Sequence, residues 1–131
     1  MLSQAIARTL AALRRYRETA EQHGASLLAV TTEGVRMASN RDDFLAPAAE
    51  VLGATVRLLG GDEEAELSYR SVAQETGDAG PLRVIDIGGG STEIAVGEGM
   101  TLRSSVSHRI GAVRLTERFV TGDPPTPEVV A

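Results

Sequence analysis

The chain has 131 residues, enough for one modest domain, and its 42% hydrophobic and 24% charged residues are ordinary for a globular protein. It contains no cysteine, no apolar run near the ~20 residues of a membrane span and no signal-peptide pattern, so we expect a cytoplasmic protein without disulfides, cysteine–zinc sites or thiol catalysis. The net charge of −5 argues against a general affinity for nucleic acid, although a local metal or arginine site still permits an anionic substrate.

The first third of the chain predicts a helix, a short strand and a second helix. Apolar residues spaced i, i+4 and i+7 predict a helix from Leu2 to about Gln22. The segment Leu27–Thr32, rich in Leu, Ala and Val, predicts a strand. A second helix is expected from Arg36 to about Leu52, with Pro47 marking a kink or a restart. Three arginines toward the end of the first helix are more typical of a solvated helix end than of phosphate binding: Arg14, Arg15 and Arg17.

Arg36 stands at the junction of the first strand and the second helix. A guanidinium at such a junction can bind a phosphate through two hydrogen bonds. The same side chain can equally form a surface ion pair with Asp42 or Asp43, and the spacing favours that simpler interpretation.

A second strand–helix pair follows. Residues 55–59 predict a strand, and the acidic segment after Gly60 predicts a helix to about Gln74. Asp62 suits an N-cap, while Glu63 and Glu64 favour the positive first turn of the helix. Alternatively, one of these acids projects from the strand end as a base or as a group that positions water. The alternation of strands and helices predicts an α/β fold with parallel strands.

Residues 84–97 predict a strand, a tight turn and a second strand. Asp86 lies inside the apolar run Val84–Ile87, and burying an unpaired carboxylate costs several kcal/mol, so this residue needs a partner or a cation. Gly88–Gly90 can adopt positive φ and allow a ligand to approach the backbone, and Ser91 and Thr92 add hydroxyls. This combination favours the binding of a metal-bound phosphate over a plain hairpin capped by the aspartate.

Three common motifs are absent from this turn. The chain has no Gly-Lys-Ser/Thr, which excludes a P-loop of the Walker type. Glu93 stands where both the dinucleotide fingerprint and the G-x-S-x-G nucleophile elbow require a glycine.

The end of the chain completes a three-stranded meander. Thr101–His108 predicts a third strand after a glycine turn, and the segment from Ile110 leads into a helix to about Phe119. Residues 121–127, rich in proline, predict no regular structure.

Four stretches, in this order, resemble the Ppx/GppA phosphatase family, which contains exopolyphosphatases and guanosine pentaphosphate phosphohydrolases. The strongest is Asp86–Glu93, which is similar to the second phosphate motif of the family almost letter for letter. Thr32–Asn40 resembles its Thr-Ser-Ala-x-Arg-x-Ala-x-Asn segment, and Gly61–Ala65 resembles its Ser-Gly-x-Glu-Glu-Ala segment. Ile110–Leu115 resembles its Leu-Gly-x-Val-x-Leu segment.

The resemblance implies the actin-like ATPase superfold, also called ribonuclease H-like, in incomplete form. Residues 1–80 would be the remainder of a first subdomain without its N-terminal hairpin, and residues 81–131 the start of a second. The family's Asp-x-Gly-Ser-Asn-Ser phosphate loop has no match. Further departures are Glu33 and Gly34 in place of a Ser-Ala pair, Met37 in place of a Glu, and Gly60 in place of a Ser.

The resemblance also implies roles for individual residues. Glu64 would orient or deprotonate the attacking water, and Asp86 would hold Mg²⁺ or Mn²⁺ with the help of Glu93. Arg36 would neutralise a phosphate. The expected phosphate ligands are the amides or hydroxyls of Gly88, Gly89, Gly90, Ser91 and Thr92.

The implied activity is hydrolysis of a phosphoanhydride: release of terminal phosphate from polyphosphate, or conversion of pppGpp to ppGpp. The alternative is a catalytically silent phosphate-binding or regulatory fragment, which the unmatched first loop favours. An actin-like kinase or ATPase is a second rival, against which the Gly61–Ala65 match argues. We expect no nucleic-acid or membrane partner, and unpaired strand edges make a homodimer plausible.

Overall fold

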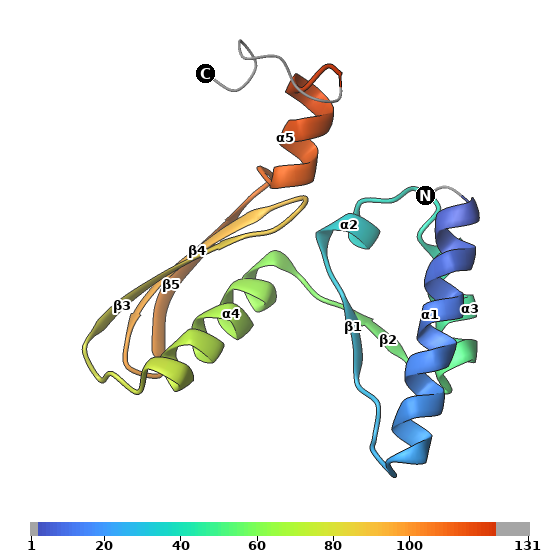
Figure 1. The fold of residues 1–131 in the computed structure, drawn as a ribbon. Helices are drawn as coiled ribbons and strands as arrows, with labels where there is room; N and C mark the ends of the chain where they lie inside the picture. Colours follow the sequence, from blue (N-terminus) through green and yellow to red (C-terminus); the bar gives the residue numbers. More distant parts are fainter. Residues whose placement is uncertain (1–2, 123–131) are drawn as a thin grey trace. The chain divides into compact units, whose positions relative to one another are not determined.

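A computed structural model describes residues 3–122 (Figure 1). The chain forms two compact units, one ending at Leu59 and the other beginning at Gly60. We expected the division at residue 80. The structure divides the chain earlier because helix α4 (Gly61–Thr76) packs on the strands of the second unit. The assignment of the units to actin-like subdomains stays a prediction.

The first unit contains three helices and two short strands. Helix α1 (Ser3–Gln22) packs against α3 (Asp42–Leu52), and α2 (Glu33–Arg36) is a single turn. Strands β1 (Ala29–Thr31) and β2 (Val56–Leu58) pair in parallel, as the alternation of strands and helices predicts. No helix within residues 3–122 has both the length and the hydropathy needed to cross a bilayer.

The second predicted helix is divided, but not at the proline. The chain leaves helical structure between α2 and α3, over residues 37–41, whereas Pro47 lies inside α3. Phe44, Ala48 and Leu52 are spaced four residues apart and are buried on one face of α3. Their packing offsets the hydrogen bond that the proline cannot donate, so the prediction of a restart near Pro47 is wrong.

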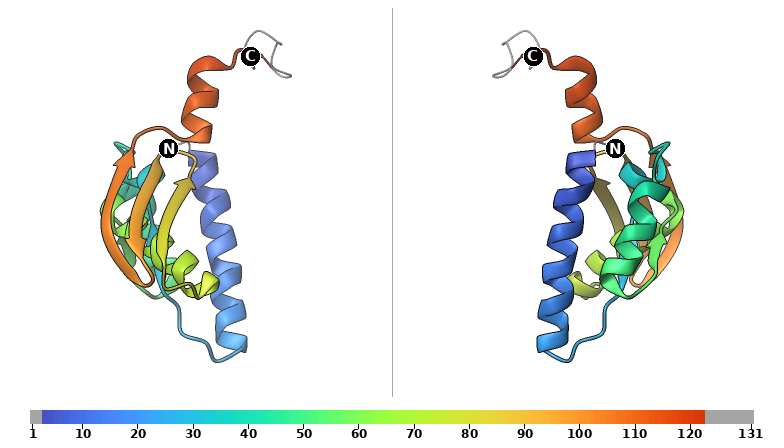
Figure 2. Two further views of the ribbon diagram at one scale, coloured as in Figure 1. Left: turned by 90° about the vertical axis from the view of Figure 1, so that its left-hand side faces the viewer. Right: turned by 90° about the vertical axis from the view of Figure 1, so that its right-hand side faces the viewer.

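The second unit is an antiparallel sheet with one helix on its face. Strands β3 (Pro81–Ile87), β4 (Thr92–Glu98) and β5 (Thr101–His108) follow one another in the order β3-β4-β5, which confirms the predicted meander. Helix α4 packs against all three strands. The left view of Figure 2 shows the three strands side by side. The chain then continues into α5 (Ala112–Phe119).

The N-cap of α4 differs from the prediction. Gly60 occupies this position with an extended backbone, and its carbonyl accepts a hydrogen bond from the amide of Glu64 at 2.9 Å. Asp62 is the second residue of the helix, so its expected role as N-cap is wrong, although it still lies in the first turn. Three carboxylates there suit the positive end of the helix dipole.

The core of the second unit lies between α4 and the sheet. Tyr69 and Ala73 of α4 pack against Val84 of β3 and Ala95 of β4. The hydroxyl of Tyr69 donates a hydrogen bond to the carbonyl of Gly99 at 2.8 Å. A Cβ atom on Gly97 would overlap that hydroxyl, so only glycine lets the helix approach this closely.

A β-bulge interrupts the pairing of β4 and β5. Val96 pairs with Ser104, whereas the next residue, Gly97, pairs with Leu102. Arg103 is therefore an extra residue in β5, as in other bulges where two residues oppose one.

Candidate functional site

Asp86 and Glu93 lie directly opposite each other in the β3–β4 ladder. Directly opposed residues of an antiparallel pair project from the same face, and here this is the face that α4 covers. The hydroxyl of Ser68, on α4, donates to Asp86 Oδ2 at 2.5 Å. The hydroxyl of Ser107, on β5, donates to Glu93 Oε1 at 2.6 Å.

The two carboxylates have no basic partner within residues 3–122, where neither forms an ion pair. Glu93 is only 2% exposed, and like charges opposed across a sheet destabilise it. Burying an ion costs several kcal/mol, while a single hydrogen bond to a charged group returns about 1.5–3 kcal/mol. A cation would balance the charge of this pair.

The pair fits a magnesium ion that also contacts phosphate. Within the described residues, no three acidic or histidine side chains lie close enough together to hold a metal. Mg²⁺ is commonly held by one or two carboxylates, with water and substrate phosphates as its remaining ligands. Asp86 is accessible for such a ligand because it lines a cavity of about 330 Å³ beside α4.

The turn formed by Gly88–Ser91, called the glycine turn below, packs on one side against the start of α5. The carbonyls of Gly88 and Gly89 accept hydrogen bonds from the amides of Ala112 at 2.9 Å and Arg114 at 3.0 Å. The carbonyl of Gly90 accepts from Nε of Arg114 at 3.0 Å. These bonds satisfy donors in the first turn of α5 that have no acceptor within the helix.

This support determines the direction of three amides. In a planar trans peptide the N–H of one residue points opposite to the C=O of the preceding residue. The amides of Gly89, Gly90 and Ser91 therefore point away from α5, and none of them has an acceptor within residues 3–122. Successive amides that point to one side form an anion-binding concavity.

The turn departs from the sequence prediction in two respects. The amide of Gly88 donates to the carbonyl of Ser91 at 2.9 Å and so closes the turn. The amide of Ser91, and not that of Gly88, is therefore the third amide of the anion-binding concavity. None of the glycines from Gly88 to Gly90 adopts the positive φ that glycine permits. The absence of a side chain instead allows α5 to pack closely against the turn, because a Cβ on Gly89 would lie 3.3 Å from Cγ2 of Val113.

The two hydroxyl residues after the turn have different surroundings. Thr92 Oγ1 donates to the carbonyl of Ile110 at 2.5 Å and fastens the turn to the segment before α5. Ser91 is only 3% exposed. Phosphate binding by either hydroxyl stays a prediction.

Glu64 lies one helical turn before Ser68 on α4, so both side chains belong to the same face of the helix. Arg36 belongs to the first unit. Its guanidinium donates to the carbonyl of Leu59 at 2.5 Å and forms an ion pair with Glu33, which is 3% exposed. Arg36 therefore pairs with Glu33, three positions before it on the same helical turn, and not with Asp42 or Asp43 as expected.

Comparison with known proteins agrees with these features. The sequence profile of the Ppx/GppA phosphatase family matches residues 1–131. The chain belongs to this family. Exopolyphosphatase 2 of Mycobacterium tuberculosis is 47% identical over 135 residues, which cover 98% of this chain and 42% of that protein. The chain thus spans about two fifths of the length of the curated relatives that it matches.

Solved structures of the family share the fold. A Ppx/GppA crystal structure from Aquifex aeolicus superposes with a TM-score of 0.78 at 34% identity, covering 99% of this chain and 43% of the other. An exopolyphosphatase from Cytophaga hutchinsonii gives a TM-score of 0.88 at 28% identity, covering 98% and 42%. The expected α/β fold is therefore confirmed as that of the Ppx/GppA family.

Within the Ppx/GppA fold, the strongest sequence motif becomes one local group. Asp86, Glu93 and the glycine turn lie together, while Arg36 belongs to the other unit. Sequence reasoning did not identify Ser68 or Ser107, because each reaches its carboxylate from another element. The only available signal for Ser68 was its i+4 spacing from Glu64.

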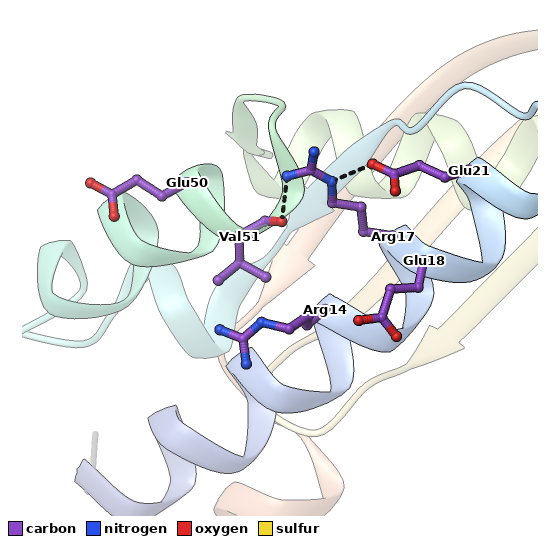
Figure 3. Close-up of a pocket in the computed structure, with 6 residues that line it drawn as sticks. All are labelled: Arg14, Arg17, Glu18, Glu21, Glu50 and Val51. Carbon is purple, nitrogen blue, oxygen red and sulfur yellow. Dashed lines mark hydrogen bonds and ion pairs between the residues drawn. The ribbon is translucent and has the colours of Figure 1, made fainter.

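A cavity of about 460 Å³ between α1 and α3 has a different character (Figure 3). Arg17 Nε binds Glu21 at 2.6 Å, and its Nη1 donates to the carbonyl of Val51 at 3.2 Å. Arg14 lies in the same cavity with two further carboxylates, Glu18 and Glu50. The arginine charge is balanced by acids, which favours the structural interpretation of these arginines over phosphate binding.

Proposed function

We propose that this chain provides the magnesium and phosphate half of a phosphoanhydride hydrolase that releases terminal phosphate from inorganic polyphosphate. The observation that carries the proposal is the Asp86–Glu93 pair, which is opposed across a sheet and has no basic partner within residues 3–122, and of which Glu93 is buried. The exopolyphosphatase name of the 47% identical relative supports the choice of substrate. Conversion of pppGpp to ppGpp is the related reaction to be tested beside it.

The proposed roles follow from the directions of the groups. The amides of Gly89, Gly90 and Ser91 bind oxygens of the terminal phosphate. Asp86 and Glu93 hold Mg²⁺, which neutralises charge on those oxygens when bound. Arg36, which belongs to the other unit and pairs with Glu33, stays a candidate for neutralising phosphate charge.

Glu64 orients the attacking water and accepts its proton. A water oxygen then forms the new bond to phosphorus, and the bond to the bridging oxygen breaks. The shortened polyphosphate leaves with the electron pair of that bond. The reaction needs no covalent intermediate, because positioning and charge stabilisation supply the catalysis.

The test measures phosphate release from long-chain polyphosphate with Mg²⁺, using the chain, its Asp86→Asn variant and a family-length protein that contains the same residues. Release that depends on Asp86 supports the proposal. Unchanged release by the Asp86→Asn form of the family-length protein contradicts it. Mg²⁺-dependent binding of polyphosphate without release by either length favours the silent phosphate-binding fragment, and transfer of phosphate from ATP to an acceptor favours a kinase.

A further inference from the structure

The two site carboxylates are each held by one serine from a different element. Ser68 reaches Asp86 from α4, and Ser107 reaches Glu93 from β5. In both cases the hydroxyl occupies one carboxylate oxygen, Oδ2 of Asp86 and Oε1 of Glu93. The other oxygen of each carboxylate receives no hydrogen bond within the described residues.

Such restraint matters more when the protein offers few ligands. Aspartate and glutamate side chains rotate about two and three bonds, and this freedom is lost when they bind a metal. With only two carboxylates available, the orientation of each one decides whether both oxygens meet at one cation. Hydrogen bonds to metal-binding carboxylates serve this purpose in other sites, and their loss weakens metal affinity by roughly 10–100-fold.

We propose that Ser68 and Ser107 are positioning residues of the metal site, which direct Asp86 and Glu93 toward one divalent cation. This inference rests on the proposed function, because it assumes that the two carboxylates bind the metal. Both serines lie outside the segments that resemble the family motifs. It also makes α4 a part of the metal site and not only a cover for the sheet.

The chain offers two matched controls. Ser71 lies one turn after Ser68 on α4 and lines the same cavity as Asp86, but its hydroxyl makes no hydrogen bond within the described residues. Ser105 lies two residues before Ser107 and projects from the same face of β5, opposite Ala95. Its hydroxyl likewise has no protein partner in residues 3–122.

The test measures the affinity of the chain for Mn²⁺ and Mg²⁺ by isothermal titration calorimetry. At each of the two positions, Ser→Thr keeps a hydroxyl and Ser→Val replaces it with a methyl group of almost equal size. We expect Ser68→Val and Ser107→Val to bind Mn²⁺ at least tenfold more weakly than Ser68→Thr and Ser107→Thr, respectively. Ser71→Ala and Ser105→Ala should remain within twofold of the unaltered chain. Melting temperatures without metal separate a loss of folding from a loss of affinity.

The outcomes distinguish this inference from the proposed function. Suppose that Asp86→Asn abolishes metal binding, while the Thr and Val variants of Ser68 and of Ser107 bind the metal equally well. The positioning role is then overturned and the metal site stands. If the unaltered chain binds no divalent cation, or if Asp86→Asn binds as well as the unaltered chain, both are overturned. Weak binding by the Val variants, with normal binding by the Thr variants, supports both.

Discussion

A Cβ atom on Gly111 would lie 2.5 Å from the carbonyl carbon and oxygen of Gly89, so the start of α5 meets the glycine turn with no space to spare. We predict that Gly111→Ala separates the two, because the clash involves backbone atoms that cannot move independently. Overpacking of this kind typically costs about 1–3 kcal/mol. The three hydrogen bonds that set the direction of the turn would weaken at the same time, so polyphosphate binding should fall at least tenfold.

Gly60→Ser is the control for this variant, because serine adds a Cβ and is also favoured at a helix N-cap. Gly60 has φ of −76°, and a Cβ there meets nothing within 4 Å. Urea unfolding and a polyphosphate-binding titration should show little change. Equal effects at both glycines would contradict the role assigned to the contact between Gly111 and the turn.

Tyr69 stabilises the second unit through its hydroxyl, whose shorter hydrogen bond goes to the Gly99 carbonyl. Tyr69→Phe keeps the ring and removes the donor to the Gly99 carbonyl, so we expect a loss of about 0.5–1.5 kcal/mol in urea unfolding. Gly97→Ala should cost more, since its Cβ would overlap the tyrosine hydroxyl and the backbone oxygen of Thr101. The reverse order would show that α4 can move away from the sheet without penalty.

Glu33 and Arg36 form an ion pair whose two members should respond unequally to removal. Glu33 has 4% of its side chain exposed, against 24% for Arg36. Arg36→Ala removes a positive partner of a buried carboxylate and should cost at most about 3–5 kcal/mol. Glu33→Gln leaves the arginine in reach of water and should cost less. A double-mutant cycle measured by urea unfolding checks this, and additive effects would contradict the coupling.

The role proposed for Glu64 predicts a separation of binding from turnover. In an active, family-length protein, Glu64→Gln should reduce the rate of phosphate release by about 10²–10⁴-fold, as expected when a general base is lost. Affinity for polyphosphate should remain near that of the unaltered protein. Glu63→Gln is the matched control on the same helical turn. Normal turnover in the Glu64 variant would exclude it as the base.

Local patterns predicted most of the second unit. The start of β5 (Thr101–His108) follows from the glycine-containing turn before it, and the meander follows from short turns between strands. The break over residues 37–41 was not predicted, because Pro47 is the stronger local signal and only the buried face of α3 overrides it. Sequence spacing located the candidate site but not its serines, which depend on contacts between distant segments.

The bulge in β5 has a consequence for changes in chain length. Because Arg103 is an extra residue, deletion of one residue between Leu102 and Ser107 can be absorbed by closing the bulge, with the remaining pairs retained. Strand β4 has no extra residue at this bulge. A deletion between Glu93 and Ala95 would turn one of them to the opposite face of the sheet, and either the carboxylate pair or the core would be lost. The unit should therefore tolerate shortening on one side of this ladder and not on the other.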